Sequence, residues 1–369
     1  MKPIRKSFDF LILITVLILL AFGIIIVFSA SAPLAASTSK NTYAVVQDQL
    51  IFAGLGIIAM LVMANFDYRV LYKLAPLIMV VSIILLILVL VPGIGREVKD
   101  TWRWIYIGPI HFQPSEIAKL AVILFLARSV SNRKNKIRSF FKGLLPYFLL
   151  IAVISALLLK EPHLSCTIIV VLVSAVILFA AGAKIFHFVI LAVPAVAGLG
   201  IVVATVPYMQ KRVLSFINPW NDLQGDGWQV VQSLYAIGSG GLFGRGLGKS
   251  MQKFLYIPEP HNDFIFPVLA EELGFVGVVA VMALFMILIW RGIKVAVTAP
   301  DMFGSLTAVG ITSLIAIQTL LNIAVVTSSV PPTGVSLPFF SAGGTSLLLF
   351  LTEMGILLNI SRYANYDRP

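Results

Sequence analysis

The sequence contains little charge: Asp, Glu, Lys and Arg together make up only 12% of its 369 residues. A water-soluble domain uses about 25% charged residues to cover its surface. Hydrophobic residues reach 59%, in long apolar runs that recur along the chain. Such runs are typical of membrane helices, so we predict a single integral membrane domain over residues 1–369.

Cysteine and histidine are also scarce. The only cysteine, Cys166, excludes an internal disulfide and a cysteine-rich metal site, and in its apolar run we expect it to be a small packing residue. The histidines at 111, 163, 187 and 261 match no zinc-binding spacing. His261 stands two residues before Asp263 and is a candidate for tuning its protonation.

The net charge of +11 does not indicate nucleic-acid binding, because the basic residues lie mainly between apolar runs. Near the N-terminus, Lys2, Arg5 and Lys6 precede an apolar stretch, and Ser29–Ala32 resembles a signal-peptide cleavage site. The stretch over 8–28 is longer than a signal core, so we expect a retained first helix.

At about 20 residues per crossing, the apolar runs predict an all-α fold of ten transmembrane helices. Most of the 27 basic residues fall on the side of the N-terminus, which predicts that both termini are cytoplasmic in a bacterial inner membrane. The expected helices are 8–30, 46–65, 71–92, 114–130, 143–159, 164–182, 186–208, 264–290, 303–329 and 340–361.

Two of the predicted outer segments are too long to be simple connectors. They cover about 93–113 and, between the seventh and eighth helices, about 209–262. Within the second, 228–237 could form an amphipathic helix lying on the membrane face. No internal repeat is visible, so the inverted repeats of many secondary transporters are missing.

Several charged residues fall within or beside the apolar runs, where a charge costs about 2.5–3.5 kcal/mol. Glu116 and Lys119 stand three apart and can pair on one helix face. Asp263 is either a helix cap or a functional carboxylate. For Glu271 and Glu272 we favour packing or pairing inside the bundle, and Glu353 has no assigned role.

The glycine-rich stretch at 238–248 is not a nucleotide-binding loop. Gly248-Lys249-Ser250 ends like a P-loop, but Phe243 stands where its first glycine is needed. Backbone amides of a glycine-rich turn can still cradle a diphosphate, with Arg245 and Lys249 neutralising its charge.

Several further motifs stand out: Ser29-Ala-Ser31, Phe112-Gln-Pro-Ser-Glu-Ile-Ala-Lys119, Asn218-Pro-Trp220, Gln232-Ser-Leu-Tyr-Ala-Ile-Gly-Ser-Gly-Gly241, Pro258-Glu-Pro-His-Asn-Asp-Phe-Ile-Phe266, Ala270-Glu-Glu-Leu-Gly274 and Gly343-Gly344. Over nearly the whole chain they resemble the shape, elongation, division and sporulation (SEDS) family, which includes FtsW, RodA and SpoVE. The division and sporulation branches are the most similar in Phe216-Ile-Asn-Pro-Trp, Pro-His-Asn-Asp and Leu358-Asn-Ile-Ser-Arg362, with an FtsW-like protein as first choice and a RodA-like one as second.

This resemblance implies a ten-helix peptidoglycan glycosyltransferase that polymerises lipid II outside the membrane. It implies an essential outer aspartate at Asp263, a fourth-helix acid and lysine at Glu116 and Lys119, and arginines at Arg103 and Arg212. It further implies a divalent cation, Mg²⁺ or Mn²⁺, and a class B penicillin-binding protein as transpeptidase partner.

The sequence departs from the family pattern at three places. The usual Gln-Pro-Asp-Leu-Gly is Glu161-Pro-His-Leu-Ser165, the usual tyrosine near the last helix is Ala342, and Lys99-Asp-Thr-Trp102 replaces Asn-Gly-Ala before the arginine-tryptophan pair. The motif that contains Asp263 is intact, so we still expect the glycosyltransferase activity.

The resulting hypothesis is that Asp263 acts as general base on a sugar hydroxyl of the acceptor lipid II. The diphosphate that leaves needs positive charge, from Arg212, Arg245, Lys249 or a divalent metal. A carboxylate among basic neighbours stays ionised, as a base requires. Two alternatives remain: a lipid II flippase that uses Glu116 and Lys119 as a polar path, and a non-catalytic scaffold for division proteins.

Overall fold

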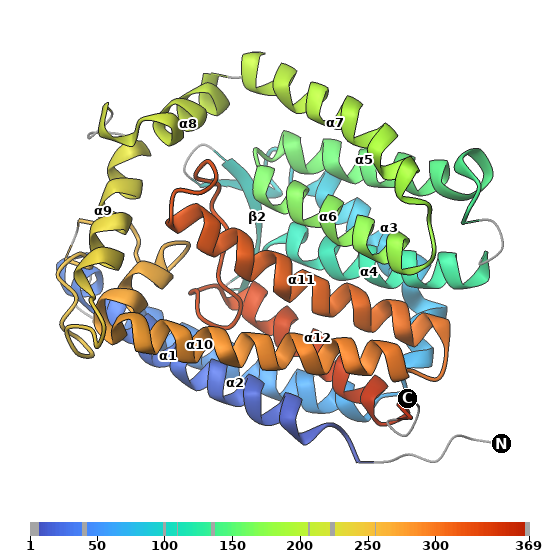
Figure 1. The fold of residues 1–369 in the computed structure, drawn as a ribbon, viewed down its shortest axis with the longest axis horizontal. Helices are drawn as coiled ribbons and strands as arrows, with labels where there is room; N and C mark the ends of the chain where they lie inside the picture. Colours follow the sequence, from blue (N-terminus) through green and yellow to red (C-terminus); the bar gives the residue numbers. More distant parts are fainter. Residues whose placement is uncertain are drawn as a thin grey trace.

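The computed structural model describes residues 7–38, 43–98, 101–108, 110–133, 137–205, 207–221, 226–254 and 256–365, and they form one helical bundle (Figure 1). By length and composition, seven helical segments can cross a membrane, which confirms a multi-pass membrane protein. They are Phe10–Pro33, Ala44–Asn65, Tyr68–Leu88, Phe140–Lys160, Ile265–Thr298, Met302–Val326 and Gly344–Ser361.

Every predicted helix has a counterpart, although the ends differ. The counterparts are α1 (Phe10–Thr38), α2 (Ala44–Asn65), α3 (Tyr68–Leu88), α4 (Pro114–Asn132), α5 (Leu145–Lys160, preceded by the π-helix η2, Phe140–Leu144), α6 (Leu164–Ala180), α7 (Ile185–Thr205), α10 (Ile265–Thr298), α11 (Met302–Val326) and α12 (Gly344–Ser361).

The predicted end of α10 at 290 was wrong, because the charged Arg291 and Lys294 remain helical. Arg291 donates from Nε to Asp9 Oδ2 at 2.9 Å, an ion pair that offsets the burial of both groups. The predicted start of the last helix at 340 was also wrong, since α12 begins at Gly344. Ser29–Ala32, the cleavage-like segment, lies inside α1.

The outward-facing side chains of the helices are apolar, and small residues lie where helices contact one another. On α2, Ile51 and Ile58 are exposed, whereas Gly56 faces α12 so closely that an added Cβ would lie 2.4 Å from Leu351 Cδ1. Gly355 on α12 approaches the backbone of Met60 in the same way. This pattern of small residues between helices is typical of membrane bundles, where close backbone approach replaces the hydrophobic effect.

The all-α prediction missed a small antiparallel sheet. Its strands β1 (Gly95–Val98), β2 (Thr101–Ile107) and β3 (Ile110–Phe112) lie in the order β1-β2-β3, with Ile105 opposite Phe112. The sequence signal was available, because β2 alternates the aromatic residues Trp102, Trp104 and Tyr106, which favour strands. The sheet fills the segment predicted as the first long connector and packs on α4.

The second long segment, predicted over 209–262, contains helices in its first part, up to Ser239, and its described residues beyond that point form turns and loops. It contains most of α8 (Pro207–Ile217), the 3₁₀ turn η3 (Pro219–Asn221) and α9 (Asp226–Ser239). The helix predicted over 228–237 is therefore confirmed as α9. Figure 1 shows α8 and α9 at the end of the bundle away from the end of α12, with α9 beside the start of α10.

Candidate functional site

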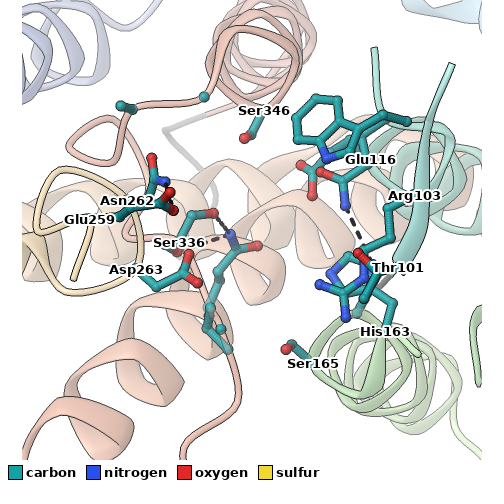
Figure 2. A pocket seen from close by; sticks show the side chains of 18 of the residues that line it. Thr101, Arg103, Glu116, His163, Ser165, Glu259, Asn262, Asp263, Ser336 and Ser346 are labelled. Carbon is teal, nitrogen blue, oxygen red and sulfur yellow. Dashed lines mark hydrogen bonds between the residues drawn. The ribbon is translucent and has the colours of Figure 1, made fainter. Parts of the chain in front are cut away.

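The described residues enclose a cavity of about 630 Å³ where the sheet meets the ends of several helices. Figure 2 shows Asp263 and Ser336 on one side of it, with Arg103, Glu116 and His163 on the other. Of the seven residues predicted for the site, five line this cavity: Arg103, Glu116, Lys119, Arg212 and Asp263.

Asp263 reaches the cavity from the segment before α10. The helix begins at Ile265 with Phe264 as its N-cap residue, so the alternative that Asp263 caps the helix was wrong. Its carboxylate lies against Gly334, where an added Cβ would be 2.7 Å from Asp263 Oδ2. Its backbone oxygen accepts a hydrogen bond of 2.9 Å from Asn322. The carboxylate therefore faces the cavity from a segment anchored at its backbone.

Glu116 and Lys119 form the predicted ion pair, with 2.9 Å between Nζ and Oε1. Pro114 is suited to the first turn of α4, and Glu116 in that turn is favoured by the positive end of the helix dipole. Lys119 also donates to Gln318 Oε1 at 3.0 Å. Both charged side chains are at most 9% exposed, yet they line the cavity, so the pair is reachable from it.

Two arginines contribute positive charge to the same cavity. Arg103, from β2, donates from Nε to the carbonyl of Glu161 at 3.1 Å and from Nη2 to the carbonyl of Pro162. Arg212, from α8, donates from Nη1 to the carbonyl of Pro332 at 2.7 Å. Backbone carbonyls thus hold both arginine side chains at the cavity, where a guanidinium group can pair with an anionic ligand.

The electrostatics of the cavity involve two residues that the sequence reading did not select. Burial lowers the pKa of His163, and the charges of Arg103 and Lys119 lower it further, so this cavity residue is neutral at physiological pH. Burial raises the pKa of the Glu161 carboxyl to about 8, against the opposing charge of Arg103. Their position, directly before α6 and within the variant 161–165 motif, was the available signal.

Arg245 and Lys249, the other two predicted site residues, do not line this cavity. The amides of Arg245 and Gly246 donate to the carbonyls of Glu271 and Glu272 at 2.9 and 3.0 Å. These two amides are thus already used within the protein, and the part of the glycine-rich turn, Arg245 and Lys249 in binding a diphosphate stays a prediction. The glycine-rich turn instead packs on a break in α10 at Gly274, where φ is +66°.

Beneath this turn lies a second group of charges, the acid cluster, built around Glu271 and Glu272. Glu271 accepts from Ser250 Oγ at 2.6 Å and lies 3.5 Å from Arg245, while Glu272 pairs with Lys253 at 2.8 Å. Ser29 of α1 donates to Glu272 Oε1 at 2.6 Å. The prediction of pairing inside the bundle is confirmed for both glutamates.

The remaining candidates take mainly packing positions. Cys166 is buried as predicted, and its Sγ donates to the carbonyl of Ser115 at 3.6 Å. Glu353 is buried in α12. His261 accepts at its backbone oxygen from Ala342, and its influence on Asp263 stays a prediction. Among the described residues, no three His, Cys, Asp or Glu side chains gather into a metal-binding group.

Comparisons with known proteins agree with this arrangement. A family model described as cell cycle protein, FtsW/RodA/SpoVE, matches residues 9–366. The stage V sporulation protein E of Bacillus subtilis is 46% identical over 98% of this chain and 99% of its own. The probable peptidoglycan glycosyltransferase FtsW of Trichlorobacter lovleyi is 42% identical, over 98% of this chain and 95% of its own.

Two solved structures share the fold. One, described as coordinating polymerization and crosslinking in a peptidoglycan synthase complex, has a TM-score of 0.79 and 30% identity, over 98% of this chain and 99% of its own. The rod shape determining protein RodA of Thermus thermophilus has a TM-score of 0.71 and 29% identity, over 96% of this chain and 97% of its own.

Proposed function

Because the chain belongs to the FtsW/RodA/SpoVE family, we propose that it is a peptidoglycan glycosyltransferase that polymerises lipid II into glycan strands. The observation that carries this proposal is the cavity itself. It combines a carboxylate, Asp263, with a buried acid–lysine pair and two arginines. This is the charge arrangement needed by a reaction that removes a proton from a sugar hydroxyl and releases a diphosphate.

In the proposed reaction, Asp263 accepts the proton of the acceptor sugar 4-hydroxyl. The hydroxyl oxygen forms a bond to the anomeric carbon of the growing strand, and the bond from that carbon to undecaprenyl diphosphate breaks. Arg103 and Arg212 line the cavity, which supports the proposal that they neutralise the negative charge of the leaving diphosphate. Arg245 and Lys249 lie outside the cavity lining, so this step does not use them.

The lysine of the pair has a separate part in this proposal. Lys119 holds Glu116 at 2.9 Å, so its ammonium is partly neutralised before any substrate enters. It therefore suits an uncharged acceptor hydroxyl or an amide of the substrate. Lys119 orients the acceptor while the arginines hold the donor.

We include the divalent cation in the proposal. The carboxylates of Asp263 and Glu259 both line the cavity, and Mg²⁺ commonly binds one or two carboxylates together with substrate phosphates. When bound, such an ion supplies a Lewis acid that neutralises the leaving diphosphate. The small number of carboxylates indicates that it binds with the substrate rather than in a cage built only from protein.

We propose that α4, α6 and α7 complete ten crossings with the seven long apolar segments, which puts the cavity on the outer face. The excess of basic residues at the opposite side supports this orientation. An even number of crossings also agrees with the backbone N–H of Asp9, near the start of α1, donating to Ser361 Oγ at the end of α12. Both termini are then cytoplasmic.

We further propose a class B penicillin-binding protein as partner. The solved relative with a TM-score of 0.79 is described as a peptidoglycan synthase complex in which polymerization and crosslinking are coordinated. The matched chains overlap almost completely, so this protein offers the same bundle to a crosslinking enzyme. The FtsW-like division branch remains the first choice, with elongation and sporulation as alternatives.

The deciding experiment is lipid II polymerisation by the purified protein with its cognate partner and Mg²⁺, comparing wild type with Asp263→Asn. We expect glycan strands from wild type and a loss of at least about 1,000-fold in the variant, because the base is removed. Asp48→Asn is the matched control, since Asp48 is exposed on α2 and does not line the cavity.

The alternative function, a lipid II flippase, is favoured by one observation: Glu116 and Lys119 form a buried polar pair at the cavity. If the protein is a flippase, the Asp263→Asn variant keeps its transport activity, and the wild-type protein forms no glycan strands. Translocation of fluorescent lipid II in proteoliposomes measures this directly. Transport without polymerisation by wild type, under conditions where a related complex polymerises, would replace our proposal.

A further inference from the structure

Two amide side chains on α11 connect the two sides of the cavity, and neither was selected from the sequence. Gln318 and Asn322 stand four residues apart, so they lie on one face of the helix. Gln318 is 1% exposed and Asn322 is 0% exposed. Burying an amide is costly unless its hydrogen bonds are satisfied. Asn322 Oδ1 has no hydrogen-bond partner among the described residues, so the donor side of Asn322 and both ends of Gln318 indicate what these residues hold in place.

Gln318 joins Lys119 to the segment before α12. Its Oε1 accepts from Lys119 Nζ at 3.0 Å, and its Nε2 donates to the carbonyl and the hydroxyl of Ser336 at 3.1 and 3.0 Å. A lysine ammonium only donates and a carbonyl only accepts. The orientation of the amide is therefore fixed by its neighbours, and its two ends are not interchangeable.

Asn322 makes the corresponding connection one turn later. Its Nδ2 donates to the carbonyl of Asp263 at 2.9 Å and to the carbonyl of Val335 at 2.6 Å. Gly334, the residue before Val335, is the one against which the Asp263 carboxylate packs. The segment 334–336 is thus attached to α11 at two points, and Asp263 is attached both to α11 and to that segment.

We propose that Gln318 and Asn322 are positioning residues, which fix the distance and orientation between Lys119 and Asp263. This inference rests on the proposed function. It makes α11 the rigid element that aligns Asp263, the proposed base, with Lys119, the proposed acceptor-binding lysine. Asp263 and Lys119 come from α10 and α4, which are far apart in sequence. Because misplacing a reacting group by about 1 Å can cost about 100-fold in rate, their alignment needs such a fixed link.

The test uses the purified complex with lipid II, and it compares kcat and KM for four variants with wild type. Gln318→Leu and Asn322→Leu remove the links, and we expect kcat to fall at least about 10-fold with KM changed less than about twofold. Gln318→Glu keeps an oxygen for Lys119 but loses the donor to Ser336, so we expect a similar fall in kcat.

Thr319→Val is the matched control. Thr319 lies on the same helix, is 1% exposed, and its Oγ1 has no hydrogen-bond partner among the described residues. We expect kcat and KM of this variant within about twofold of wild type. Size-exclusion profiles and melting temperatures, measured for every variant, identify any variant that does not fold. If a Gln318 variant does not fold, Ser336→Ala takes its place, with a smaller expected fall in kcat.

The outcomes distinguish a failure of the positioning proposal from a failure of the proposed glycosyltransferase function. Wild-type kcat in Gln318→Glu would overturn the part played by the donor to Ser336, and an equal loss in Thr319→Val would overturn positioning altogether. A rise in KM with unchanged kcat in Gln318→Leu would assign it to substrate binding instead. These results presuppose that wild type polymerises and Asp263→Asn does not; no polymer from wild type is a failure of the proposed function.

Discussion

The cavity and the acid cluster both contain buried carboxylates and a buried lysine, yet they differ in access. Glu116 and Lys119 pair in the wall of an open cavity, whereas Glu272 and Lys253 pair beneath the glycine-rich turn. Glu271 and Glu272 bond to Ser29, Ser250, Met251 and Lys253, which cover both carboxylates, although Ser29 and Lys253 also line a second, mainly apolar pocket of about 460 Å³. Buried charge within a bundle therefore does not by itself identify a functional site; access to substrate does.

Replacing the lysine of each pair by methionine gives the strongest test of this difference. Lys119→Met leaves Glu116 unpaired and removes a group that we place on the acceptor, so we expect polymerisation to fall at least about 100-fold. Polymer formed per folded molecule is the measurement. The double variant Glu116→Leu with Lys119→Met no longer contains the unpaired carboxylate, so we expect it to restore the melting temperature without restoring activity. Recovered activity in the double variant would contradict a role for the pair in the reaction.

Lys253→Met in the acid cluster is expected to act on stability instead. Removing one partner of a buried ion pair costs about 3–5 kcal/mol, and Glu272 would lose its bond to Nζ at 2.8 Å. We expect a clearly lower melting temperature, with the activity of the remaining folded protein within about threefold of wild type. Lys249→Met, at an exposed neighbouring lysine outside the cavity, should change neither quantity.

The last expected effect is a pH dependence of stability caused by Glu161. Its pKa is raised to about 8 by burial, from an ordinary value of 4.5, so the folded protein binds this proton more tightly than the unfolded chain. The contribution is complete below pH 4.5 and is lost as the pH rises to about 8, by at most about 1.4 kcal/mol per pH unit.

Melting temperatures of wild type and Glu161→Gln between pH 5 and 8.5 check this expectation. Wild type should lose stability relative to the variant as the pH rises, because glutamine carries no proton to release. A difference that does not change with pH would contradict a buried protonated carboxyl at this position.

The helices and the Glu116–Lys119 pair could be predicted from local patterns in the sequence, whereas Arg103, Arg212 and the role of Asp263 came from the resemblance to the SEDS family. Apolar runs predict helices, and Glu116 and Lys119 are three residues apart on one helix. The β-strands were missed although β2 alternates aromatic residues, because the segment was read as a connector between helices. Arg245 and Lys249 were placed in the site by their glycine-rich setting, which in fact serves the break in α10 at Gly274.

The sequence by itself determined that this is a helical membrane protein of a glycosyltransferase family, since composition, apolar runs and motifs are properties of the chain order. Only the tertiary structure decided which charges share a cavity and which are covered. Gln318 and Asn322 show why: an amide in an apolar helix has no distinguishing local pattern. Its role appears only when α4, α10 and the segment before α12 bring Lys119, Asp263 and Ser336 to within hydrogen-bonding distance of that helix.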